Sequence, residues 1–183
     1  KDLYKEMEAR MQGAIQALED DIAGIRTGRA NPSLVERMQV EYYGTATPLM
    51  QIANITVPDA RTLMIRPFDA STLKNIEKAL LASNLGLTPN NDGKVIRLNL
   101  PPLTEERRHE LAKVVHNRLE EARVAVRNIR RDGIKDIKEW KAEKLISEDE
   151  ERQGEEELQK ITDRFIAQID KIGERKQKEI MEI

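Results

Sequence analysis

Four arginines stand close together near the middle of the longest helical pattern in the chain. They are Arg123, Arg127, Arg130 and Arg131, and residues 122–131 contain no acidic side chain. At about 100° per residue, the four fall on adjoining parts of one helix surface, beside an apolar seam. The planar guanidinium suits phosphate oxygens better than the lysine ammonium does. The pattern therefore indicates a cationic face that can bind phosphates.

The same arginines could instead form a solvated face in which salt bridges neutralise them. Composition alone favours that interpretation, because 31 basic and 33 acidic residues give a net charge of −2 and charge runs usually form solvated faces. Locally, however, only Glu120 can reach Arg123 at helical spacing, and Asp132 follows the run directly. Arg107 and Arg108 begin the same predicted helix and extend its basic character. The local sequence therefore favours phosphate binding.

No catalytic or metal-binding constellation accompanies the arginines in the sequence. There is no cysteine, and the two histidines, His109 and His116, lie about two helical turns apart, too far to bind one metal without other ligands. The acidic runs 148–151 and 155–157 are typical of solvated helix faces. No phosphate-loop, dinucleotide-binding or nucleophile-elbow motif occurs. We therefore expect a protein that is not an enzyme and needs no metal or cofactor.

Composition predicts mostly helix and an intracellular location. Of the 183 residues, 35% are charged and 3% are aromatic, which is typical of long helices with charged surfaces and not of a β-sandwich. No apolar run approaches the roughly 20 residues that span a bilayer, and none resembles a signal peptide. The lack of cysteine suits a reducing compartment. Because the sequence begins with Lys1, import into an organelle after loss of a transit peptide stays open.

Three long amphipathic helices are predicted to position the arginines. Apolar residues recur in steps of three and four over residues 2–27, about 104–145 and about 148–180. Each helix needs partners for its apolar stripe, so the three are expected to form one long antiparallel bundle. Gly28 and Pro32 are predicted to end the first helix. Thr104 is predicted to begin the second helix as its N-cap, and the capping box of Ser147 and Glu150 to begin the third.

A smaller α+β unit is predicted between the first two helices. Strands are expected over residues 40–43, 52–57, 62–66 and 95–100, with turn residues at 44–48 and 89–93. Ser71 is predicted to cap a helix that runs to about Ala82. The predicted fold class is α+β: a bundle of residues 1–29 and 104–183, with an inserted β/α/β domain of residues 30–103. A domain joined through only two connections is expected to move.

Five motifs, in order along essentially the whole chain, resemble the ribosome recycling factor family. The resemblance implies a three-helix bundle with an inserted β/α/β domain and an L shape similar to that of tRNA, in agreement with the architecture predicted from periodicity. The motifs are IRTGRANP at 25–32, VEYYG at 40–44, PPLTEERR at 101–108, VAVRNIRR at 124–131 and ISEDE at 146–150.

The resemblance also implies a function after translation termination. A ribosome recycling factor binds the post-termination ribosome on its large-subunit side and, with elongation factor G, splits it into subunits and releases it from mRNA. The implied partners are the large subunit with its ribosomal RNA and elongation factor G, and no membrane is involved. The resemblance further implies a monomer that acts in the bacterial cytoplasm. The motifs place ribosomal RNA contacts at Arg108, Arg127, Arg130 and Arg131, with Arg26 and Arg29 as second-tier candidates. The cationic helix face adds Arg123 as a further candidate. The motifs place a hinge at Gly28, Arg29, Pro102 and Leu103.

The alternative from a different class is a coiled-coil adaptor, whose charged faces would pair with another helical protein and never contact RNA. RNA binding predicts a steep salt dependence, whereas the adaptor would bind its protein partner without it. A carboxylate-based hydrolase stays a formal alternative, since no acid pair lies in a recognisable pocket motif. Gly133 departs from the family pattern; it is expected to cost about 1 kcal/mol relative to alanine and to soften the helix locally.

Overall fold

The computed structural model describes residues 2–83 and 85–182 and divides into two compact units. One unit contains Lys1–Ile22 and Ala112–Lys178, and the other contains Ala23–Leu111 and Glu179–Ile183. The predicted domain boundaries at 29/30 and 103/104 stay a prediction. Within the described ranges, no helix is both long enough and apolar enough to cross a membrane.

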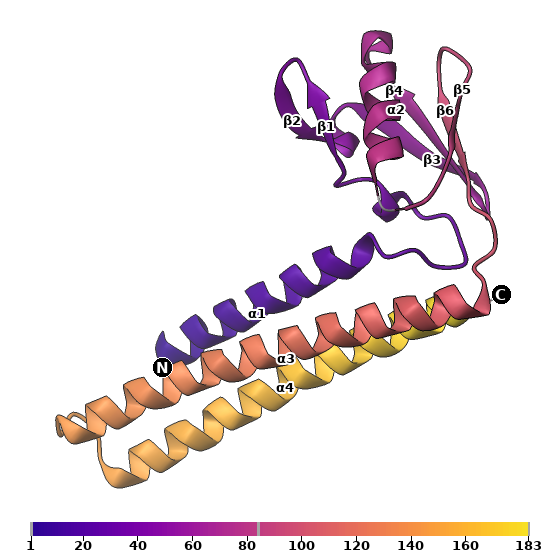
Figure 1. Ribbon diagram of the computed structural model, residues 1–183. Helices are drawn as coiled ribbons and strands as arrows, with labels where there is room; N and C mark the ends of the chain where they lie inside the picture. Colours follow the sequence, from indigo (N-terminus) through magenta and orange to yellow (C-terminus); the bar gives the residue numbers. More distant parts are fainter. Residues whose placement is uncertain (1, 84, 183) are drawn as a thin grey trace. The chain divides into compact units, whose positions relative to one another are not determined.

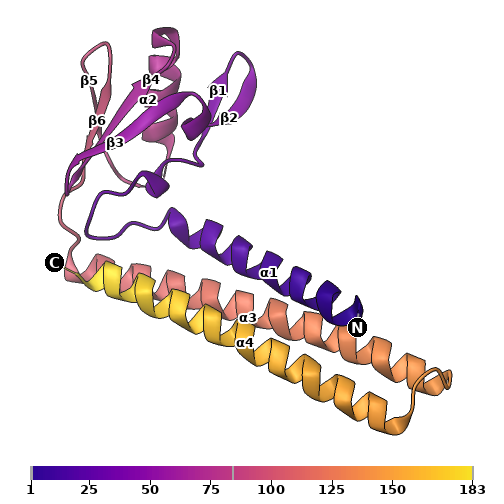
Figure 2. The ribbon, with the colours of Figure 1, turned by 180° about the vertical axis from the view of Figure 1, so that it is seen from behind.

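The predicted three-helix bundle is present and makes up the first unit, although the start of α3 and the end of α4 are assigned to the second. It is built from α1 (Asp2–Ala23), α3 (Glu105–Ala142) and α4 (Glu148–Met181). Helices α1 and α4 run in the same direction and α3 runs against them (Figures 1 and 2). Because each helix has one apolar stripe, the three stripes meet along a common seam. Side chains buried in this seam include Met7, Met11, Val115, Val126, Leu158, Ile161 and Ile169.

Gly133 lies where the three helices approach one another closely. A Cβ atom at this position would be 3.0 Å from Leu158 Cδ1 of α4 and 3.2 Å from Met7 Sδ of α1. Helix α3 continues through Gly133 without a break. The glycine that was expected to soften α3 therefore makes room for both neighbouring helices.

Two helix ends differ from the sequence-based prediction. Helix α1 ends at Ala23, before the predicted Thr27; Gly24 follows directly, and the Ser33 hydroxyl donates a hydrogen bond to the Ala23 carbonyl at 3.1 Å. Helix α3 ends at Ala142, not Leu145, in a Schellman turn. In that turn the Leu145 amide bonds to the Trp140 carbonyl at 2.8 Å, and Lys144 takes a φ of 62°. Gly24 directly follows the last residue of α1, whereas α3 ends with Lys144, and not a glycine, in the left-handed conformation.

Helix starts follow the predicted caps in two cases out of three. Thr104 Oγ1 accepts a hydrogen bond from the Arg107 amide at 3.1 Å, and Ser147 and Glu150 exchange side-chain-to-amide bonds of 3.1 and 3.2 Å as a capping box. The prediction for Ser71 is wrong. Asp69 caps instead, accepting from the Ser71 amide at 3.0 Å to open the 3-10 turn Ala70–Thr72 that leads into α2 (Leu73–Ala82).

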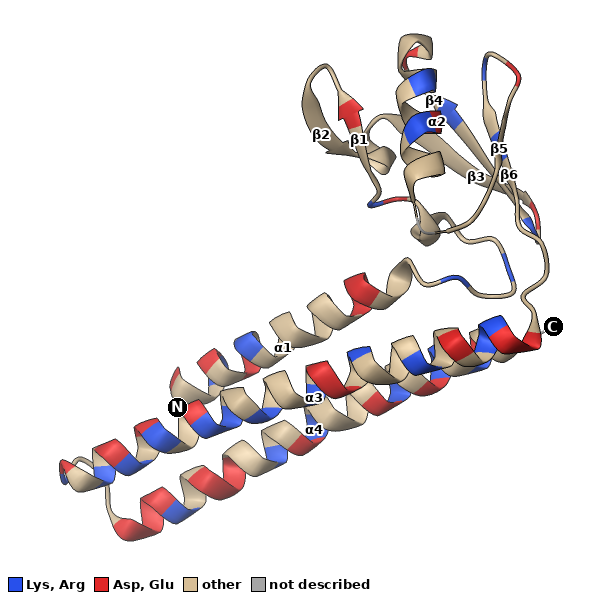
Figure 3. Cartoon of the chain, in the orientation of Figure 1, with Lys and Arg blue, Asp and Glu red and all other residues tan. Residues whose placement is uncertain are grey.

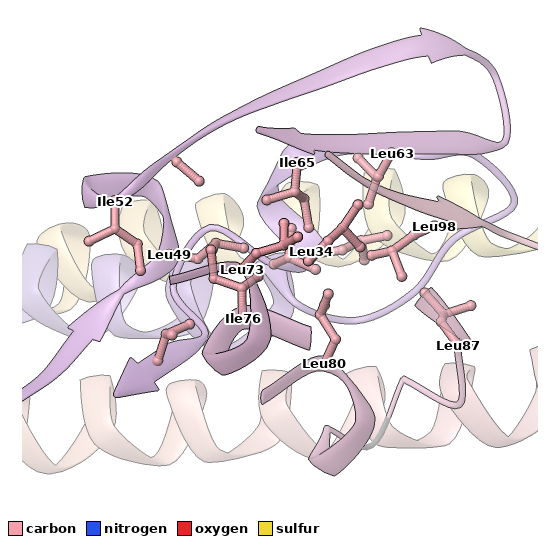
Figure 4. Packing of buried hydrophobic residues seen from close by; sticks show 14 of the residues in the cluster. Leu34, Leu49, Ile52, Leu63, Ile65, Leu73, Ile76, Leu80, Leu87 and Leu98 are labelled. Atoms are coloured by element: carbon pink, nitrogen blue, oxygen red, sulfur yellow. The ribbon is translucent and has the colours of Figure 1, made fainter. Parts of the chain in front are cut away.

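The second unit contains two antiparallel sheets and α2, which confirms the α+β class. Strands β1 (Gln39–Tyr42) and β2 (Thr45–Pro48) form a hairpin. The larger sheet has the order β3-β4-β6-β5, made of β3 (Ala53–Asp59), β4 (Thr62–Pro67), β6 (Ile96–Asn99) and β5 (Pro89–Asn91). Side chains of this sheet, of α2 and of the 3-10 segments Pro32–Leu34 and Leu49–Gln51 form one buried cluster (Figure 4).

Strands β2 and β5 correct the prediction, which placed turns at both segments. Each is short and lies at the edge of its sheet, where proline is tolerated. Neither shows the alternation of buried and exposed residues by which a strand is recognised. The turn between β1 and β2 is limited to Tyr43 and Gly44, which have φ values of 48° and 82°. Positive φ at both central residues is what a type I′ hairpin turn requires.

Candidate nucleic-acid interface

Arg127 and Arg131 lie on the face of α3 that points away from the bundle seam. Val126, which precedes Arg127, and Ile129, which lies between the two arginines, are buried, whereas both arginines are exposed. Within residues 2–83 and 85–182, neither guanidinium forms a hydrogen bond or an ion pair. Their positive charge is therefore available to a ligand in solution.

Arg123 has a different environment although it belongs to the same run. Its guanidinium donates to Asp170 of α4 at 2.7 Å and to Glu120, one turn earlier on α3, and its side chain is only 18% exposed. The hydrogen bond to Asp170 is the main cause of a raised Arg123 pKa; burial opposes it, and the bond to Glu120 adds to it. The sequence revealed Glu120 but not Asp170, since Asp170 lies in another helix.

Arg130 also reaches across to α4, but its partner is neutral. Its Nη1 donates to Gln159 Oε1 at 2.5 Å, and Gln159 in turn donates to Asp163 at 2.8 Å. The Nε atom of Arg130 is buried without a hydrogen-bond partner in the described chain. An amide partner holds the guanidinium in place without neutralising it. Arg130 thus keeps its positive charge beside the exposed arginines Arg127 and Arg131.

The second unit holds the other predicted contacts. Arg26 donates a hydrogen bond to the Pro101 carbonyl. Burial lowers the pKa of Arg26, and the positive charges of Arg107 and Arg61 lower it further. Arg108 is half-buried in the first turns of α3, and its Nε has no partner among the described residues. The Arg29 side chain is exposed.

The predicted hinge residues lie beside segments that are fastened to the β3–β4 turn. The Ala30 amide donates to the Ala60 carbonyl and the Leu100 amide donates to the Arg61 carbonyl, both at 2.7 Å. Leu103 is buried and Pro102 is exposed. Gly28 has no space for a side chain, because a Cβ atom would lie 2.8 Å from the Glu182 carbonyl oxygen. That contact, and not an unusual backbone angle, requires glycine at position 28.

Acidic and basic residues are intermixed along α3 and α4 (Figure 3), so the exposed arginines form a local feature on a nearly neutral protein. No group of three or more potential metal ligands occurs in the described part of the chain. Both histidines are exposed, and His109 lies 3.9 Å from Glu105. Lys135 and Lys138, which the sequence-based prediction does not include, continue the same helical spacing beyond Arg131 and are exposed.

Comparison with known proteins identifies the family. Residues 18–181 match the family described as ribosome recycling factor. The chain belongs to this family. The ribosome-recycling factor of Roseiflexus sp. (strain RS-1) is 53% identical over 182 residues, covering 100% of this chain and 98% of the relative. That of Syntrophomonas wolfei subsp. wolfei (strain DSM 2245B / Goettingen) is 54% identical over 183 residues, covering 100% and 99%.

Solved structures of the family have the same fold. The solution structure of a ribosome recycling factor aligns with a TM-score of 0.81 at 46% identity, covering 100% of this chain and 97% of that chain. A second structure comprises models for the T. thermophilus ribosome recycling factor and the E. coli elongation factor G bound to the E. coli post-termination complex. Its matching chain aligns with a TM-score of 0.71 at 49% identity, covering 100% of this chain and 98% of that chain.

Proposed function

We propose that this chain binds the large subunit of the post-termination ribosome through ribosomal RNA and, with elongation factor G, splits the ribosome into subunits and frees it from mRNA. It acts as a monomer and catalyses no reaction itself, in the bacterial cytoplasm. Support comes from family membership and from the T. thermophilus relative, which was described bound to a post-termination complex together with elongation factor G. The observation that carries the proposal is the pair of exposed, unpaired arginines, Arg127 and Arg131, on α3.

The proposed RNA contacts differ in how free their charge is. Arg127 and Arg131 come first, because no group within the described ranges competes for them. Arg130 and Arg108 follow, since each has a buried Nε atom without a partner. Arg29 and Arg26 are weaker candidates, because Arg26 already donates to Pro101. Arg123 is last: two carboxylates would have to release it before it could bind a phosphate.

We also propose that residues 1–29 and 104–183 move relative to residues 30–103 about Gly28, Arg29, Pro102 and Leu103. The bonds from Ala30 and Leu100 to the β3–β4 turn hold both connections to the sheet. Rotation would then be confined to the hinge residues, which precede Ala30 in the first connection and follow Leu100 in the second. The Arg26 bond to Pro101 joins the two connections, so they would move together.

Two measurements test this function. Binding of the chain to purified large subunits should weaken steeply as salt rises, because phosphate contacts release counterions. Light scattering should then show that post-termination ribosomes split only when the chain, elongation factor G and GTP are all present. Binding that does not respond to salt would favour the coiled-coil adaptor, and splitting that does not require the chain would refute the recycling role.

A further inference from the structure

The cationic face of α3 does not end with the arginine run. Arg127, Arg131, Lys135 and Lys138 follow one another at steps of four, four and three residues. At about 100° per residue they fall within an arc of roughly 80°, approximately opposite the buried seam of Val126, Gly133 and Ile137. At 1.5 Å per residue, the stripe is about 17 Å long. All four side chains are exposed.

The two lysines are as free of partners as the two arginines. Throughout the described part of the chain, the side-chain ammonium group of neither lysine forms a hydrogen bond or an ion pair. The neighbouring acid Asp132 is occupied elsewhere, since it pairs with Arg10 of α1 at 2.8 Å. The stripe therefore keeps its charge along its whole length.

A shallow groove, largely open to solvent, lies along the part of this stripe that begins at Arg131. It has a volume of about 430 Å³ and is lined by Arg131, Ile134, Lys135, Lys138, Glu139 and Ala142. Ile134 and Ala142 supply an apolar surface between the cationic side chains. Three cations and one acid give the groove a net charge of +2, which selects an anionic occupant. All lining residues belong to one helix, so the groove has a rigid base.

We propose that this groove binds one nucleotide of ribosomal RNA, extending the contact made by Arg127 and Arg131. The inference rests on the proposed function, since it assumes that the arginine face meets RNA. Lys135 and Lys138 contact phosphates, and the sugar or base lies against Ile134 and Ala142. The Glu139 carboxylate can accept a hydrogen bond from the ribose 2′-hydroxyl, which DNA lacks. The cationic side chains of the groove thus match the phosphate of a nucleotide, and its apolar surface matches the sugar or base.

The first test compares three double variants in binding to purified large subunits over a series of salt concentrations. Lys135→Ala with Lys138→Ala should weaken binding about tenfold at moderate salt and lower the salt slope by about 2, one for each lost phosphate contact. Lys160→Ala with Lys171→Ala is the matched control, because both lysines are exposed on α4 and form no bond among the described residues. The control should bind as the unchanged chain does.

The third variant, Arg127→Ala with Arg131→Ala, separates the two proposals. If it loses affinity while the Lys135 and Lys138 variant does not, the groove proposal is wrong and the proposed function stands. If neither variant loses affinity, both are wrong. If the control loses as much affinity as the Lys135 and Lys138 variant, the effect is general charge loss and the groove proposal fails.

A second test locates the occupant. The chain has no cysteine, so Ala142→Cys creates a single site for a thiol-reactive photo-crosslinker, and Lys171→Cys on α4 is the control. On the large subunit, the label at position 142 should cross-link to ribosomal RNA at one place and the control should not. Cross-links from position 142 to a ribosomal protein alone, or equal RNA cross-linking from both positions, would overturn the proposal.

Discussion

Replacing Arg127 with alanine should weaken binding to the large subunit without lowering the free energy of unfolding. The side chain is exposed and has no partner in the described part of the molecule, so its removal leaves no buried group unsatisfied. Such surface substitutions change stability by less than about 0.5 kcal/mol. Loss of one arginine contact to RNA costs about 1–3 kcal/mol of binding, or roughly 5- to 150-fold in affinity.

Arg123→Ala is the matched perturbation, four residues away on the same helix, and should have the opposite effect. It removes the ion pairs with Asp170 and Glu120, whose side chains are about half exposed at 50% and 48%. Water screens such pairs, so each contributes up to about 1 kcal/mol. Packing of the largely buried arginine stem adds to this. We expect a loss of about 1–2 kcal/mol in the free energy of unfolding and little change in affinity.

Urea unfolding followed by circular dichroism gives the stability of both variants, and co-sedimentation with large subunits at two salt concentrations gives their affinities. The denaturant slope should be the same for both variants, so that midpoints can be compared directly. The reasoning fails if Arg127→Ala unfolds at as low a urea concentration as Arg123→Ala. It also fails if Arg123→Ala loses more affinity than Arg127→Ala.

Four further substitutions test predictions of stability. Gly13→Ala should raise the free energy of unfolding by about 1 kcal/mol, since nothing lies within 4 Å of its Cβ position. Gly173→Ala should lower it by about 1–3 kcal/mol, because that Cβ would lie 2.5 Å from Leu119 Cδ1; thermal unfolding of both variants checks the contrast. Lys144→Gly should raise the free energy of unfolding by about 1 kcal/mol, because Lys144 has a left-handed backbone conformation that glycine adopts without strain. Urea midpoints would show the difference. Amide hydrogen bonds from Val95 and Lys94 lower the pKa of Asp92 below its ordinary 3.8. Its contribution is therefore present above pH 3.8 and is lost as the pH falls through the lower folded-state value. Asp92→Asn should accordingly be less stable than the parent at neutral pH, and acid titration of unfolding should show that difference shrinking.

The helices were predictable because their signal is repeated many times along the chain. Each long helix offers an apolar residue every three or four positions, and the caps at Thr104 and Ser147 combine a local side chain with a local amide. The exact helix ends were predicted less well than the helices themselves. The apolar spacing of the first helix continues to Ile25, and this outweighed the local stop signal of Gly24. The hydrogen bond from the Ser33 hydroxyl to the Ala23 carbonyl forms only after the chain has turned back.

The edge strands were missed for a related reason. A strand is recognised from alternating burial, but β2 has no buried residue, and β5 has only Pro89 buried among three residues. Pairing with a neighbouring strand makes these segments extended, and their own composition is that of turns. Asp69 and Ser71 could both cap the following helical segment, and only the backbone geometry decides between them.

The positions of the arginines around α3 can be worked out from the sequence, and they separate the paired arginines from the free ones. If the centre of the α3 seam is taken from its buried residues, Arg130 and Arg123 lie at about 60° and 80° from it, and Arg127 and Arg131 at about 120° and 160°. The first two contact α4 and the last two contact nothing in the described chain. A side chain near the seam can reach the neighbouring helix, whereas one on the opposite side cannot. The angle from the apolar seam, more than the density of charge, therefore separates arginines that hold the bundle together from those whose charge is left for RNA.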